Sequence, residues 1–111
     1  MKQFGYTALL RDDPKLIAEY EEYHRHVWPE VLAYNAQRGV LGCKIFLLGR
    51  RLFMYLTVKD EFDLSNNLGP TPGQAPQVEK WDRLMRERYL EPVPESTTGE
   101  AWTMMDLICD S

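Results

Sequence analysis

The chain has 111 residues, of which 44% are hydrophobic and 27% charged, with a formal net charge of −4 and an isoelectric point near 5.1. This composition predicts one globular domain over residues 1–111 and excludes a disordered chain. The basic residues are interspersed with acidic ones, so we expect no nucleic-acid partner. No apolar run approaches the ~20 residues that span a bilayer, so we expect no membrane association.

The N-terminus and the cysteines point to a compartment. The opening stretch MKQFGYTALLRDDP has too short an apolar run for a signal peptide. Cys43 and Cys109 are isolated thiols without the paired spacing of a zinc site or a disulfide framework. Reduced cysteines in a chain without a leader fit the cytoplasm, which is the location we expect.

The first residues predict a strand followed by a helix. Residues 2–10 place apolar side chains at every second position, which is typical of a strand. Asp13 is a suitable N-cap and Pro14 suits the first helical position, so a helix should begin there. It should run to about Val27, with a Glu21–Arg25 ion pair on its solvent side.

A second helical segment and a hairpin should follow. Pro29 disfavours helical geometry at the preceding residue, so it should begin a new segment that stops at Gly39. The runs CKIFLL (43–48) and RLFMYLTV (51–58) then flank a tight Gly-Arg turn, which predicts a β-hairpin. Both runs are nearly continuous in apolar residues, as in strands covered on both faces. Helices can cover one face, and we expect a second subunit to cover the other.

The C-terminal half predicts one long helix between loops. DEFDLSNN (60–67) suggests a short helix, and LGPTPGQAP (68–76) is a loop rich in Pro and Gly. A third helix should span about 77–90, followed by the loop 91–100 and a closing strand at 101–109. The inner stripe of the third helix should comprise Val78, Trp81, Leu84, Met85 and Tyr89.

The order of elements is strand, helix, strand, strand, helix, strand. This is the order of the split βαβ, ferredoxin-like arrangement, in which helices cover one face of an antiparallel sheet. We therefore predict an α+β fold whose other sheet face is bare. A homodimer through that sheet face is the expected consequence.

One helical stripe carries groups suited to acid–base chemistry. Tyr20, His24 and Trp28 are spaced by four residues and share a helix face. Histidine has an unperturbed pKa near ~6.5, close to the ideal for proton transfer at neutral pH. The same spacing also fits a core stripe with a polar edge, and the pattern alone does not decide between the two. His26 points elsewhere and is expected to be a solvated residue.

The other candidate site residues can also be explained by structural roles. Trp81 fits either a core position or a surface that stacks on a sugar ring. Asp82 fits either a group that binds sugar hydroxyls or the i,i+4 partner of Arg86. Cys43 fits a small apolar residue better than a reactive thiol. The sequence has no Gly-rich phosphate loop, no nucleophilic serine motif and no convincing metal-ligand spacing, so we expect no metal and no cofactor.

The segment YEEYHRHVWPEV resembles the signature Y-x-x-x-H-x-x-x-W-P-E of the L-rhamnose mutarotase family. The likeness extends through the hydrophobic hairpin and the W-x-x-L-M segment to the closing strand, and covers nearly the whole chain. It implies a dimeric α+β barrel and an isomerase that interconverts the α and β anomers of a 6-deoxy-sugar. It also implies a catalytic role for His24 and sugar contacts for Tyr20, Trp81, Asp82 and Cys43.

Two positions depart from the rhamnose-type pattern. The third helix has Trp81-Asp82 where rhamnose-type members have two adjacent tryptophans, and Cys43 stands where they have a sugar-contacting tyrosine. These changes concern the sugar pocket and not the helix of His24. The pattern is closer to members associated with L-fucose, and L-rhamnose and L-fucose both remain candidates.

Three functions therefore compete. The first is a mutarotase for a small neutral monosaccharide, in which His24 moves protons without a metal or cofactor. The second is a small dimeric ferredoxin-like oxygenase or haem-binding protein, which would share this architecture. The third is a non-catalytic sugar-binding dimer, which would bind a deoxy-sugar without changing its rate of anomeric exchange.

Overall fold

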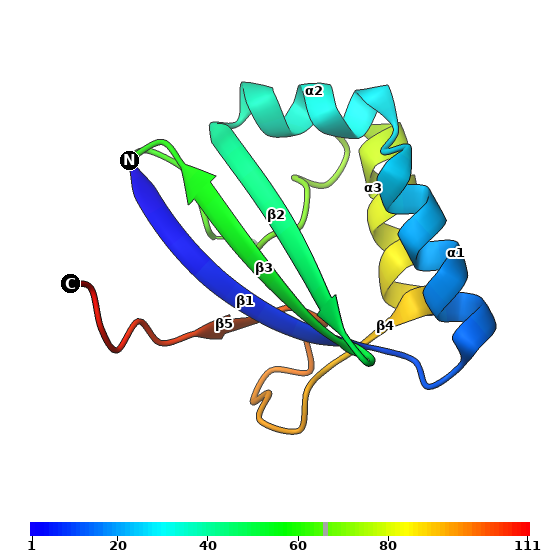
Figure 1. The fold of residues 1–111 in the computed structure, drawn as a ribbon. Coiled ribbons are helices and arrows are strands. Elements are labelled where there is room, and N and C mark those ends of the chain that lie inside the picture. Colours follow the sequence, from blue (N-terminus) through cyan, green and yellow to red (C-terminus); the bar gives the residue numbers. More distant parts are fainter. Residues whose placement is uncertain (66) are drawn as a thin grey trace.

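The computed structural model of the chain describes residues 1–65 and 67–111. Three helices and five strands form an α+β fold of the ferredoxin-like type, as the sequence predicted (Figure 1). The elements are β1 (Lys2–Leu10), α1 (Pro14–Arg25), α2 (Pro29–Gln37), β2 (Val40–Leu48), β3 (Arg51–Val58), α3 (Pro76–Leu84), the π-helical turn η1 (Met85–Tyr89), β4 (Leu90–Glu91) and β5 (Thr103–Met105).

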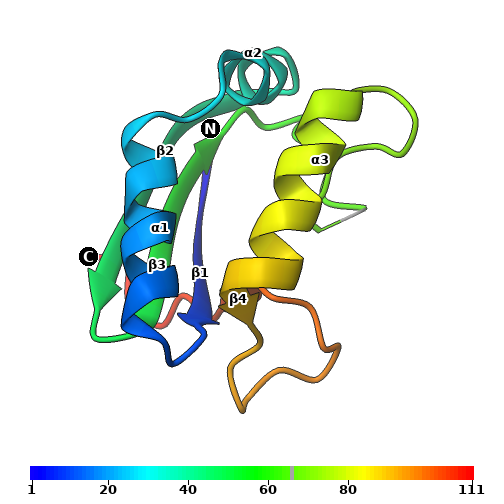
Figure 2. The ribbon, with the colours of Figure 1, turned by 90° about the vertical axis from the view of Figure 1, so that its right-hand side faces the viewer.

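The sheet is antiparallel in the order β2-β3-β1-β4, and β5 also pairs with β1. The long pairs are β1 with β3 and β2 with β3. The short strands β4 and β5 pair with successive parts of β1, at Leu9–Leu10 and Gly5–Thr7. The three helices lie on one side of this sheet (Figures 1 and 2).

The start of α1 follows the predicted capping. The Lys15 N–H donates to Oδ1 of Asp13 over 2.9 Å, and Pro14 occupies the first turn. The helix ends at Arg25 and not at Val27, because the backbone leaves helical geometry at His26. His24 therefore lies in the last turn of α1.

The predicted Glu21–Arg25 ion pair is wrong. Arg25 instead pairs with Glu22 at 2.9 Å, an i,i+3 contact that is equally accessible on a helix surface. Pro29 begins α2 as predicted, and Gly39 adopts a positive φ of 101° after its end. Such a conformation favours glycine because it has no Cβ.

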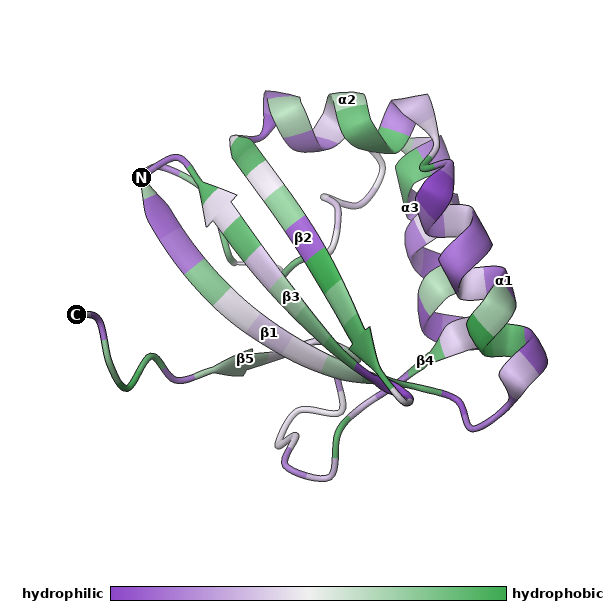
Figure 3. Cartoon of the chain, viewed as in Figure 1, coloured by the Kyte–Doolittle hydropathy of each residue, from purple (hydrophilic) through white to green (hydrophobic). Residues whose placement is uncertain are grey.

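The hairpin forms as predicted, with Gly49 at a φ of 64° in the turn. Within this single chain, however, only one face of it is covered. Alternate residues of β3 are buried toward the helices, and Phe53 and Tyr55 between them are 37% and 39% exposed. Apolar residues occupy much of β2 and β3 (Figure 3), and on β2 Phe46 and Leu48 are exposed as well.

Two predictions for the C-terminal half need correction. The described part of 60–67 is not helical, because the Asp63 side chain accepts hydrogen bonds from the Ser65 backbone N–H and hydroxyl and so stabilises a turn. Asn66 lies outside the described residues. The closing strand covers Thr103–Met105 only, since β5 finds backbone partners on β1 only at Gly5–Thr7.

The third helix is also less regular than predicted. The α-helical part ends at Leu84, and η1 continues it with a wider turn, in which the Leu90 N–H donates to the Met85 carbonyl. Leu84 is half-buried, whereas the rest of the predicted stripe is buried: Val78, Trp81, Met85 and Tyr89. Among the described residues, no helix is long and apolar enough to cross a membrane.

Substitution of the α1 cap should lower the stability of the domain. Asp13→Ala removes the acceptor for the Lys15 N–H, and we expect a loss of about 1 kcal/mol in the free energy of unfolding, measured by urea denaturation. Asp12→Ala, at the exposed residue before the cap, is the matched control and should change little. Equal losses in the two variants would contradict the capping role.

Candidate active site

A cavity of about 1160 Å³ lies between the helices and the sheet. Residues of α1, α2, α3, β2 and β3 line it, together with the loops around 67–72 and 98–102. All five site residues predicted from the sequence border this cavity: Tyr20, His24, Cys43, Trp81 and Asp82. The fold thus brings together residues that are up to 62 positions apart in the chain, from Tyr20 to Asp82.

The His24 ring is oriented by its own helix. Its Nδ1 lies 2.9 Å from the carbonyl oxygen of Tyr20, one turn earlier. A carbonyl oxygen can only accept, so Nδ1 carries the hydrogen and, in the neutral ring, Nε2 carries the lone pair. Burial lowers the pKa of His24 below 6.5, and the hydrogen bond to Tyr20 opposes this only in part. The neutral ring is therefore the main form at pH 7.

Aromatic contacts fix the position of this ring. His24 stacks on Tyr20, with centroids 4.1 Å apart and planes at 29°, and meets the Trp81 ring edge-on at 5.4 Å. Trp81 also packs edge-on against Trp28 at 5.1 Å and Tyr23 at 5.9 Å. Trp81 is only 8% exposed, so it is a core residue that also borders the cavity.

Tyr20 and Cys43 approach each other from α1 and β2. Burial, and secondly the nearby Cys43 thiol, raises the pKa of Tyr20. Cys43 is exposed within the open cavity, yet the atoms around its sulfur are enough to raise the pKa of the thiol by desolvation. At neutral pH both groups are uncharged, and the Tyr20 hydroxyl keeps its proton.

Asp82 forms an ion pair with Arg86, which the sequence suggested as the alternative to a sugar contact. Its Oδ2 accepts from Nε of Arg86 over 2.8 Å. The same side chain borders the cavity, so the ion pair holds the carboxylate there and does not remove it from the site.

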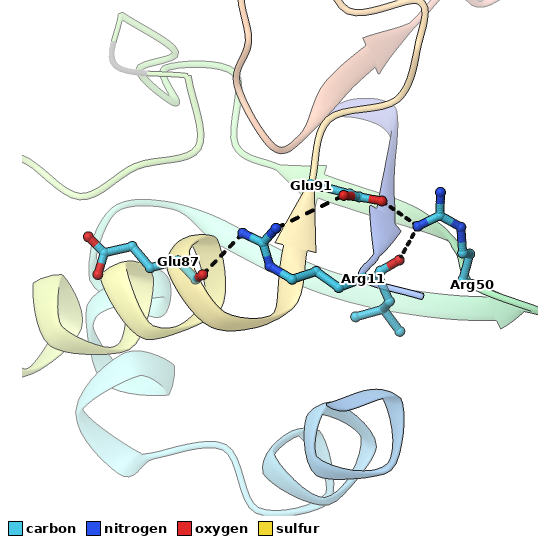
Figure 4. Close-up of polar contacts among 5 residues, drawn as sticks. Arg11, Arg50, Glu87 and Glu91 are labelled. Atoms are coloured by element: carbon cyan, nitrogen blue, oxygen red, sulfur yellow. Dashed lines mark hydrogen bonds and ion pairs between the residues drawn. The ribbon is translucent and has the colours of Figure 1, made fainter. Parts of the chain in front are cut away.

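Arginines and glutamates form a network of polar contacts (Figure 4), in which Arg11, Glu87 and Glu91 also border the cavity. Arg50 donates to Glu91 and, over 2.8 Å, to the Leu10 carbonyl. Arg11 donates to the Glu87 carbonyl over 3.0 Å and lies 4.0 Å from Glu91. These contacts tie the hairpin turn and β4 to the end of β1, and they pair the charges there.

Arg38 and Trp102 are among the residues of the cavity wall that were not predicted from the sequence. Arg38 follows the last residue of α2, and Trp102 precedes β5. The Trp102 carbonyl accepts from the side chain of Asn67 at 3.3 Å, which connects two loops of the wall. Neither residue belongs to a spacing pattern, because each reaches the cavity through loop geometry. Among the described residues, no three His, Cys, Asp or Glu side chains come together as a metal ion would require.

Comparisons with known proteins identify relatives in sequence and in fold. The L-fucose mutarotase of Xanthomonas campestris is 38% identical over 104 residues, which cover 92% of this chain and 82% of that protein. A UPF0734 protein of Dictyostelium discoideum is 37% identical over 111 residues, covering 98% of this chain and 89% of that protein. In fold, the chain resembles the crystal structure of L-rhamnose mutarotase from Formosa agariphila, with a TM-score of 0.60, 23% identity, and coverage of 90% of this chain and 100% of that one.

The sequence model of the L-rhamnose mutarotase family matches residues 3–110, nearly the whole chain. This match confirms the family and the class of enzyme, an isomerase, that were predicted from the motif around His24. The chain belongs to the L-rhamnose mutarotase family.

Proposed function

We propose that this protein interconverts the α and β anomers of a 6-deoxy-hexose, with L-fucose as the first candidate. The observation that carries the proposal is the state of His24, a neutral ring at a cavity with Nδ1–H already engaged and Nε2 left as the basic nitrogen. The 38% identity to an L-fucose mutarotase supports L-fucose over L-rhamnose. The Trp81-Asp82 pair and Cys43 support the same choice, since they depart from the rhamnose-type pattern.

The proposed reaction is acid–base catalysis of ring opening. Nε2 of His24 takes the proton of the anomeric hydroxyl, the bond between C1 and the ring oxygen breaks, and the ring oxygen receives a proton. The open aldehyde rotates about the C1–C2 bond and recloses on its other face, with both protons returned. Positioned acid–base catalysis supplies roughly 10²–10⁴-fold, which is useful for a reaction that already proceeds in water.

Tyr20 is the proposed proton donor to the ring oxygen. Its raised pKa keeps the hydroxyl protonated at neutral pH but also makes it a weaker acid, so the donation depends on the charge that forms on His24. The imidazolium that forms on His24 would lie stacked on the Tyr20 ring, at the observed 4.1 Å, and would stabilise the developing phenolate. The two groups thus exchange one proton each with the sugar.

The sugar-binding roles follow from the rest of the cavity wall. Trp81 offers an aromatic ring to the apolar face of the sugar, and Asp82, held by Arg86, offers carboxylate oxygens to its hydroxyl groups. Cys43 adds a small neutral surface beside Tyr20, suited to the methyl group of a deoxy-sugar. These are the properties that a neutral monosaccharide requires of its site.

We also propose a homodimer through the open face of the sheet. That face exposes apolar side chains that monomeric proteins seldom leave together in water: Phe46, Leu48, Phe53, Tyr55 and Met105. Gly5 belongs to this face, where a Cβ would lie 3.1 Å from the Phe53 ring. The glycine thus leaves room for the Phe53 ring on this face.

The pKa of His24 is the first test of the acid–base role. NMR titration of the imidazole protons should place His24 below 6.5, with the His26→Ala variant used to assign the signals. Since the unfolded state then binds a proton at a higher pH than the folded state, the free energy of unfolding should fall as pH drops below 6.5. His24→Gln should reduce this loss, and a His24 midpoint above 6.5 would contradict the neutral-base proposal.

Removal of the imidazole should abolish catalysis without unfolding the chain. His24→Ala should lower the rate of anomeric exchange of L-fucose by roughly 10²–10⁴-fold, measured by NMR saturation transfer between the anomeric protons. His26→Ala is the matched control, because His26 is exposed and pairs only with Glu22 among its described contacts. Equal losses in both variants would mean that packing was mistaken for catalysis, and a wild-type protein that binds L-fucose without faster exchange would support the non-catalytic alternative.

A charge placed on the open sheet face should disrupt the dimer. Phe53→Lys puts a cation in the middle of the exposed apolar face, so sedimentation equilibrium should show a monomer where the wild type is a dimer. Leu32→Lys, at an exposed apolar residue of α2 away from the sheet, is the control and should remain dimeric. A monomeric wild-type protein would refute this part of the proposal.

A further inference from the structure

Arg38 lies at a junction between the end of α2 and a loop of the cavity wall. Its guanidinium carbon is 5.2 Å from the ring centroids of both Tyr34 and Phe62. Burial lowers the pKa of Arg38, which shows that the cation is partly withdrawn from water. Its Nε is buried and has no hydrogen-bond partner among the described residues.

The remaining nitrogens of Arg38 hold the loop. One terminal nitrogen donates to the Leu68 carbonyl over 2.9 Å and the other to the Gly69 carbonyl over 3.1 Å. Tyr34, also on α2, accepts the Thr71 N–H at its hydroxyl over 3.0 Å. Three hydrogen bonds from α2 thus attach residues 68–71, a segment without helix or strand.

That segment and Arg38 itself border the proposed sugar site. Leu68, Gly69 and Arg38 all line the cavity that contains His24. Asp82 borders the same cavity, and its negative charge acts on Arg38.

Stability alone does not account for this residue. An apolar side chain would fill the space between two aromatic rings without the cost of desolvating a cation and leaving one N–H unpaired. What a guanidinium adds is a rigid fork that binds two successive carbonyl groups at once. That property fixes the course of the backbone at Leu68–Gly69.

We propose that Arg38 is a positioning residue for the mutarotase reaction, which fixes the Leu68–Gly69 backbone as part of the sugar-binding wall. The inference rests on the proposed function and extends it to substrate binding. It assigns Arg38 no contact with the reacting atoms. Loss of the fork should therefore weaken sugar binding and leave the proton transfer by His24 intact.

The test measures anomeric exchange as a function of L-fucose concentration for Arg38→Met and Arg38→Lys. Arg38→Met should raise KM about tenfold while kcat stays within about twofold, since binding and not chemistry is affected. Arg38→Lys keeps the charge but cannot bind both carbonyls, and should have an intermediate KM. Tyr34→Phe, which removes the second attachment of the loop, should raise KM in the same direction.

Two controls separate positioning from simple loss of stability. Arg25→Met removes an exposed arginine that pairs with Glu22 outside the cavity, and its KM should not change. Val58→Ala weakens the core beside Phe62 and should lower the melting temperature without raising KM. Amide hydrogen exchange should accelerate at Thr71 in Arg38→Met more than in Val58→Ala.

Each outcome has a definite meaning. A wild-type protein that accelerates no deoxy-sugar overturns the proposed function, and the role of Arg38 with it. Suppose instead that the wild-type protein is active. An Arg38→Met variant whose KM is unchanged, or that loses kcat alone, then overturns the role of Arg38 only. A rise in KM no larger than that of Val58→Ala would also overturn it.

Discussion

The packing of Trp81 against α1 is the contact on which the site depends. The indole meets the rings of Tyr23, His24 and Trp28, so it joins α3 to the end of α1 and to the break before α2. Because α1 ends at Arg25, the imidazole lies in the last helical turn, where the Tyr20 carbonyl still accepts its Nδ1–H. The packing thus fixes the position of the His24 ring, the Tyr20 carbonyl sets its tautomer, and burial favours its neutral state.

The charged groups at the cavity are arranged in a way that suits a neutral ligand. Two of the cavity's carboxylates are paired with arginines, Asp82 with Arg86 and Glu91 with Arg50. The groups near His24 that are uncharged at neutral pH, Tyr20 and Cys43, have pKa values raised by burial. A charged ligand would have to break these pairs, whereas the hydroxyl groups of a sugar can bind to their remaining lone pairs and donors.

The sheet has two faces with exposed or buried apolar side chains, and the two faces have different roles. One face packs against the helices and encloses the core and the cavity. The other face exposes Phe46, Leu48, Phe53 and Tyr55 along the hairpin, together with Lys44 and Arg51, and the proposed dimer would bury it. The proposed dimer explains the nearly continuous apolar pattern of β2 and β3. That pattern predicts cover on both faces of the hairpin, and one chain covers only one of them.

The sequence by itself determined the local structure and the family. Alternation in β1, the Asp13–Pro14 cap, Pro29 and the glycines at 39 and 49 act through their immediate neighbours, so they predicted β1, the start of α1, α2 and the hairpin correctly. The motif around His24 also identified the family, because its residues are near one another in the chain.

Only the tertiary structure decided how distant segments meet. It placed Cys43 beside Tyr20 and brought Arg38 and Trp102 into the cavity wall, neither of which follows a spacing rule. It also limited β5 to Thr103–Met105, the three residues that find partners on β1. Contacts between residues far apart in the chain depend on how all the elements pack together, and no local pattern encodes that.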